Sequence, residues 1–91
     1  ERYRRVAYKK SQHTDNAILV YPNPSQGQFF IKNIAKKSHL NIFDYQGVKV
    51  HSESIQKNNI FQCNVNLTSG IYILELVNSD GTFKKIISIT H

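Results

Sequence analysis

The sequence predicts an all-β fold, specifically a small immunoglobulin-like antiparallel β-sandwich of about seven strands. Short runs of β-favouring residues recur roughly every eight to twelve positions from Ile18 onward, and turn-forming residues separate them. No window sustains helical spacing with capping residues. The chain has 91 residues, which is the size of one domain.

Seven runs are expected to form the strands. They cover residues 18–21, 28–33, 39–44, 48–53, 60–67, 71–77 and 82–90. In the fifth run Phe61, Cys63 and Val65 alternate with polar residues, which indicates one buried face and one solvated face. The sixth run is almost continuously apolar, which is typical of a strand at the centre of a sheet.

Turn chemistry explains where the runs stop. Pro22 and Pro24 remove backbone donors and are expected to hold an extended, non-pairing segment after the first run, while Gly27 permits a positive φ. The tetrad from Asp44 to Gly47 predicts a hairpin turn, as do residues 78–81.

The sixth run begins with two residues of special interest. Gly70 is expected to allow a sharp approach of the chain before this strand. Tyr72 is expected to anchor the strand in the core while its hydroxyl reaches a polar partner.

The sequence contains no set of residues typical of catalysis, so we predict that the chain is not an enzyme and binds no cofactor. Asp44 and Asp80 are explained as turn residues, and Cys63 as a small buried residue rather than a reactive thiol. None of the four histidines has a cysteine or carboxylate at metal-ligand spacing. His39 and His51 are expected to be exposed cross-strand neighbours, which alone make a poor zinc site.

The basic charge is unevenly distributed. The formal net charge is +6, and five of the twelve Lys and Arg residues precede residue 11. We interpret residues 1–17 as a linker or the tail of a preceding domain, with an anionic partner such as lipopolysaccharide, a membrane surface or nucleic acid as the weaker reading. We expect no transmembrane segment and no signal peptide in this sequence, and its abrupt start suggests a fragment of a longer protein.

Four short motifs occur in a fixed order. The first is Tyr21-Pro22-Asn23-Pro24-Ser25 with Gly27; then follow Ile42-Phe43-Asp44 with Gly47, Gly70-Ile71-Tyr72 after Leu67, and Lys84-Lys85-Ile86-Ile87. This set resembles the C-terminal sorting domain, type A, of proteins exported by the type IX (Por) secretion system of Bacteroidetes. The resemblance covers residues 18–91. Val48, where a lysine is common, and Cys63 depart from the family pattern.

The resemblance implies a sorting function. Domains of this family accompany a covalently preceding cargo domain through the periplasm to the cell surface or the extracellular medium. They are recognised by the outer-membrane translocon and its shuttle protein, and a sortase-like protease often removes them, after which the cargo can be joined to lipopolysaccharide. The segment before Ile18 then resembles the cleaved linker, and the strand with Lys84 and Lys85 resembles the region needed for export. A nucleic-acid partner is not expected.

Two other readings stay open at this point. A surface adhesion or carbohydrate-binding sandwich would cluster exposed aromatic side chains on one sheet face, and its candidates are Phe30, Phe43 and Tyr45. A structural spacer beside a catalytic domain would normally continue well beyond Ile89. An unpaired final edge would also permit self-association by strand exchange.

Overall fold

The computed structural model describes residues 17–91, which fold into two packed antiparallel sheets. The seven strands are β1 (Leu19–Tyr21), β2 (Gln28–Ile34), β3 (Ser38–Asp44), β4 (Lys49–Ile55), β5 (Asn58–Asn64), β6 (Gly70–Asn78) and β7 (Gly81–Ile89). The predicted linker over residues 1–17 lies outside the described residues, apart from Ala17. The predicted sandwich of seven strands is confirmed.

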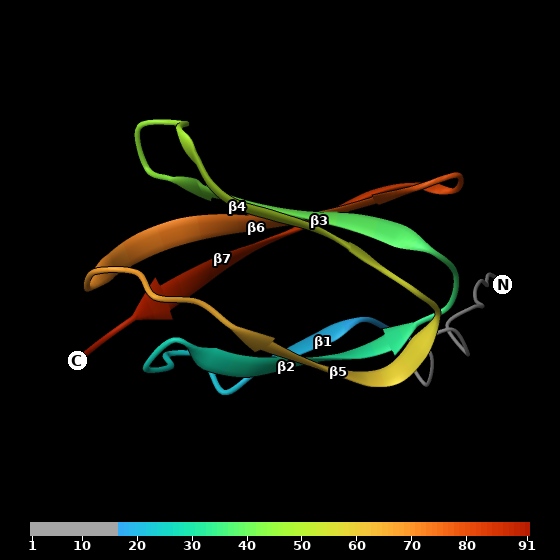
Figure 1. The fold of residues 1–91 in the computed structure, drawn as a ribbon, viewed down its shortest axis with the longest axis horizontal. Coiled ribbons are helices and arrows are strands. Elements are labelled where there is room, and N and C mark those ends of the chain that lie inside the picture. Colours follow the sequence, from blue (N-terminus) through green and yellow to red (C-terminus); the bar gives the residue numbers. More distant parts are fainter. Residues whose placement is uncertain (1–16) are drawn as a thin grey trace, which may run out of the picture.

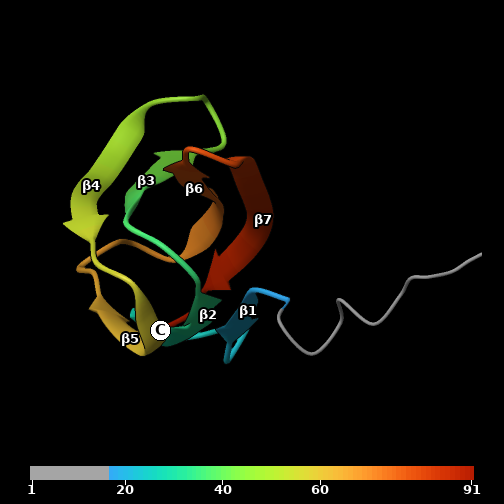
Figure 2. The same cartoon turned by 90° about the vertical axis from the view of Figure 1, so that its right-hand side faces the viewer.

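The sheets form two layers, with the strand order β1-β2-β5 in one and β4-β3-β6-β7 in the other (Figure 1). This is an immunoglobulin-like arrangement in which the fourth strand pairs with the third rather than with the fifth. β6 lies between β3 and β7, as its apolar sequence predicted. Viewed along the long axis, the two sheets curve toward each other around a common interior (Figure 2).

The core fills the space between the layers. Six of the seven strands contribute to it, because alternate residues of each strand point inward. The buried apolar side chains are Phe29, Ile31, Ile34, Leu40, Ile42, Ile55, Cys63, Tyr72, Leu74, Leu76, Ile87 and Ile89.

The strand boundaries differ from the prediction mainly around β4 and β5. The fourth strand begins at Lys49 and continues to Ile55, so Val48 belongs to the turn, and β5 ends at Asn64 rather than at residue 67. A register shift between Ile42 and Phe43 disturbs the pairing of β3 with β4. Because a bulge adds a residue to one strand, alternation alone places the boundary incorrectly.

The expected pairing of His39 with His51 is wrong. His39 pairs with Ser54 and His51 with Ile42. The two imidazoles lie on opposite faces of the sheet. His39 bonds the outward-facing Ser52, while His51 shares the inward face of β4 with Glu53 and Ile55.

No helix in the described chain has the length and apolar character needed to cross a membrane.

Candidate functional site

Three of the four sequence motifs gather at one end of the sandwich. We call this the motif end and define it by residues 22–27, 44–47, 67–72 and 89–91. β1 runs into it, β3 and β7 end there, and β2, β4 and β6 start there (Figure 1). Segments far apart in the sequence therefore form one continuous surface beside the end of β7.

The first motif clamps the edge of β7. The side-chain amide of Asn23 donates to the Ile86 carbonyl over 3.1 Å, and its oxygen accepts the Ser88 N–H over 2.9 Å. Asn23 thus supplies one donor and one acceptor, as a neighbouring strand would.

The backbone of Ser25 continues this pairing. Its N–H donates to the Ser88 carbonyl over 2.9 Å, and its carbonyl accepts the Thr90 N–H over 2.8 Å, which forms a parallel bridge with Ile89. The predicted non-pairing role of the segment is therefore wrong, although β1 does end at Tyr21. The peptide bonds before Pro22 and Pro24 are both cis.

Gly27 fixes the same segment to the three-stranded sheet. Its φ is 104°, and its carbonyl accepts the Val65 N–H over 2.8 Å. A Cβ built on Gly27 would lie 2.6 Å from the Val65 carbonyl oxygen. Both the backbone conformation and the available space therefore require glycine here.

The hairpin predicted at Asp44 is confirmed. The Gly47 N–H donates to the Asp44 carbonyl over 2.9 Å, and the Asp44 carboxylate accepts the N–H groups of Gln46 and Val48, both over 2.9 Å. Gly47 has a φ of 88°. Asp44 therefore shapes the turn through its side chain, which is a structural role.

Tyr72 forms a tyrosine corner at the start of β6. Tyr72 is 6% exposed, and its hydroxyl donates to the Thr68 carbonyl over 2.8 Å. This confirms the predicted anchor. Gly70 is different, because an added Cβ would meet Tyr72 at 3.8 Å, an ordinary contact, so the predicted sharp approach is wrong.

Two hollows open on the motif end. One of about 540 Å³ is lined mainly by apolar surface from Asp44, Tyr45 and the start of β6. The other, of about 550 Å³, is lined by Pro22, Pro24 and Thr90 among others. The motif residues thus shape both concave parts of this surface.

The two lysines of the last motif lie farther along β7. Lys84 is opposite Glu75 on the outer face, whereas Lys85 is opposite Leu74 on the inward side of the strand, where it stays exposed. The strand therefore has no single charged face. Adjacent residues of a strand point to opposite faces of the sheet, so the side chains of Lys84 and Lys85 lie on the two sides of the β7 edge.

Sequence reasoning missed the contacts of two residues at this end, His91 and Asn23. His91 donates its backbone N–H to Ser69 Oγ over 3.1 Å, and its ring lies 2.7 Å from the Leu67 carbonyl. Asn23 was part of a motif, but its contacts span more than sixty residues. No local pattern could have indicated either arrangement.

The fold and this end define a small β-sandwich whose strand β7 is clamped by the segment that contains Pro22, Asn23 and Pro24. A family model, the secretion system C-terminal sorting domain, matches residues 19–90. The chain therefore belongs to this family. Its members are non-catalytic sorting signals for the type IX secretion machinery, and they are attached to a cargo in secreted, surface-associated proteins. A search of curated proteins finds no match.

Proposed function

We propose that this domain delivers its cargo across the outer membrane by presenting the motif end and the adjoining edge of β7 to the translocon and its shuttle protein. The observation that carries this proposal is the clamp between Asn23, Ser25 and β7. It joins the first and last motifs into one surface, which gives a physical reason for these motifs to occur together.

The edge of β7 is the proposed point of contact. The clamp occupies this edge from Ile86 to Thr90. Because backbone groups alternate in direction along a strand, Lys84 presents its N–H and C=O to the same edge, and no described residue pairs with them. An incoming strand could add there, with Lys84 and Lys85 on its two sides.

Charge reversal of the lysines tests the proposal. A fluorescent reporter fused ahead of this domain is expressed in a Bacteroidetes host that carries the secretion system, and cell fractions are compared. We expect the Lys84→Glu/Lys85→Glu double variant to hold the reporter in the periplasm, because it reverses the charges beside the proposed contact edge of β7. Both side chains are exposed, so their replacement leaves the core intact.

A matched control separates surface charge from position. Lys57 is an exposed lysine between β4 and β5, at the opposite end of the sandwich. Lys57→Glu should leave surface delivery unchanged. Normal delivery of the folded double variant would refute the role of this edge.

Release by a sortase-like protease is the second part of the proposal. The family supports cleavage ahead of the sandwich, in the segment before Ile18. Mass spectrometry of the domain released by host cells would locate the cut. A cut inside residues 19–90 would contradict this assignment.

The aromatic side chains do not favour the adhesion alternative. Tyr21 and Phe30 pair on the outer face of the three-stranded sheet, with ring centroids 5.7 Å apart. Phe43 lies on the outer face of the other sheet, and Tyr45 lies in the turn after β3. The described aromatics thus form no common platform for a sugar.

A further inference from the structure

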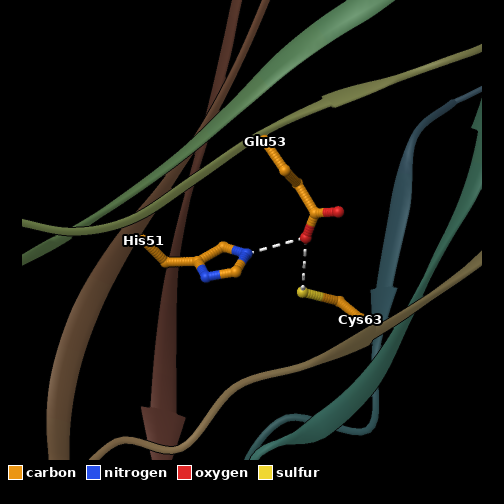
Figure 3. A group of neighbouring side chains, drawn as sticks. All are labelled: His51, Glu53 and Cys63. Carbon is orange, nitrogen blue, oxygen red and sulfur yellow. Dashed lines mark hydrogen bonds and ion pairs between the residues drawn. The ribbon is translucent and has the colours of Figure 1, made fainter.

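Three metal-ligating side chains converge between the two sheets, and none of them takes part in the motif-end contacts described above. His51 and Glu53 lie on the inward face of β4, and Cys63 lies on β5 of the other sheet (Figure 3). His51 Nε2 is 2.7 Å from Glu53 Oε2, and Cys63 Sγ is 4.0 Å from the same oxygen. The spacing of the histidines in the sequence did not indicate a metal site, and the fold brings Glu53 and Cys63 to His51.

The position of this cluster is unusual for a sandwich. Inward positions of β4 would ordinarily carry apolar residues, as Ile55 does, yet two ionisable side chains occupy the preceding inward positions. Their side chains are 26% and 35% exposed, while Cys63 is 1% exposed. The site therefore has a buried sulfur at its base and two half-buried ligands that leave it open toward solvent.

The dimensions of the cluster fit a tetrahedral ion. The three ligand atoms all lie within 4.8 Å of one another. Around zinc, with bonds of about 2.0–2.3 Å, neighbouring ligand atoms are separated by roughly 3.3–3.8 Å. Side-chain shifts of about an ångström would therefore reach zinc geometry without moving the strands.

We propose that His51, Glu53 and Cys63 form a three-ligand zinc site that links the two sheets and leaves a fourth position open. The mixture of imidazole, carboxylate and thiolate matches the borderline softness of Zn²⁺ better than that of Ca²⁺ or Mg²⁺. On binding, the ion replaces the thiol proton of Cys63, which passes to the buffer, and the proton in the bond between His51 Nε2 and Glu53 Oε2 moves to His51 Nδ1, which leaves Nε2 free to ligate. The thiolate and carboxylate together balance the charge of the ion.

The first test uses metal-stripped protein of the full chain in a phosphine reductant. Calorimetric titration with Zn²⁺ should give one site per chain, and the thermal midpoint should rise with Zn²⁺, because the ion binds the folded state. Titration with Co²⁺ should produce tetrahedral visible bands and a thiolate-to-cobalt charge-transfer band.

Variants assign the ligands. Cys63→Ser should abolish the charge-transfer band, and His51→Gln should weaken Zn²⁺ binding by on the order of 100-fold or more, since loss of an outer partner alone costs 10–100-fold. His39→Gln is the matched control, because His39 lies on the outer face of the same sheet and should not change binding. Circular dichroism verifies that each variant is folded.

The opposite results would overturn the site. If wild type gives no charge-transfer band, or if Zn²⁺ binds His51→Gln as tightly as wild type, the cluster is only a hydrogen-bonded triad around Glu53. Equal loss of binding in His39→Gln would likewise place the ion elsewhere. Because His51 is half-buried, its variant tests the site even if Cys63→Ser does not fold.

Discussion

The clamp on β7 makes a quantitative prediction about Asn23. Asn23→Ala removes two hydrogen bonds to the last strand, of 3.1 and 2.9 Å. Each such bond contributes about 0.5–1.5 kcal/mol net, and the orphaned backbone groups of Ile86 and Ser88 can bond to water at this exposed edge. We therefore expect the free energy of unfolding to fall by about 1–2 kcal/mol.

Denaturant unfolding measures this loss, and amide hydrogen exchange locates it. Exchange of the Ser88 N–H should accelerate more than that of amides in β2, since the clamp holds that proton directly. Asn23→Asp is the matched variant, because it retains the acceptor for Ser88 and loses the donor to Ile86. It should therefore protect Ser88 better than Asn23→Ala.

A null result would refute the reasoning. If Asn23→Ala changes stability by less than about 0.3 kcal/mol and leaves Ser88 exchange unaltered, the side chain does not act as a strand partner.

Three further predictions follow from other contacts. Gly27→Ala should destabilise the domain by about 2–4 kcal/mol, because its Cβ would collide with the Val65 carbonyl in a strained conformation; an unchanged thermal midpoint would contradict this. Tyr72→Phe should cost about 1 kcal/mol through loss of the bond to Thr68, measured by denaturant unfolding, with the exposed Tyr45→Phe as a neutral control. Desolvation by burial and, to a smaller extent, the charge of Glu53 raise the pKa of the Cys63 thiol from 9.0 to about 12. The folded state therefore keeps a thiol proton that the unfolded state loses above pH 9. Metal-free wild type should therefore lose about 1.4 kcal/mol more stability than Cys63→Ser between pH 7 and pH 10, and parallel pH profiles for the two would disprove it.

Much of the fold could be predicted because it depends on local chemistry. The alternation around Phe61 and Cys63 gave the correct buried face, and the side chain of Asp44 forms the hairpin that its sequence indicated. Tyr72 also took its predicted place, because a tyrosine in a buried strand needs a partner for its hydroxyl.

The remaining features depend on which strands become neighbours. His51 and Glu53 are two residues apart on one strand, but their relation to Cys63 requires β4 and β5 to lie in facing sheets. The role of Asn23 likewise requires β7 to pass beside it. Residue alternation contains no information on these neighbours. Lys84 and Lys85 lie on opposite faces because adjacent residues of a pleated strand alternate in direction.

The clamp also gives the motif end a property that no single motif has. Its two halves are separated by more than sixty residues, so this surface exists only after the opening and closing segments of the sandwich have met. Closing so long a loop is entropically costly, and it requires the intervening strands to be in position. A receptor that binds the motif end would therefore distinguish a completely folded sorting domain from a partly folded one. Binding at this surface would then depend on the folding state of the domain.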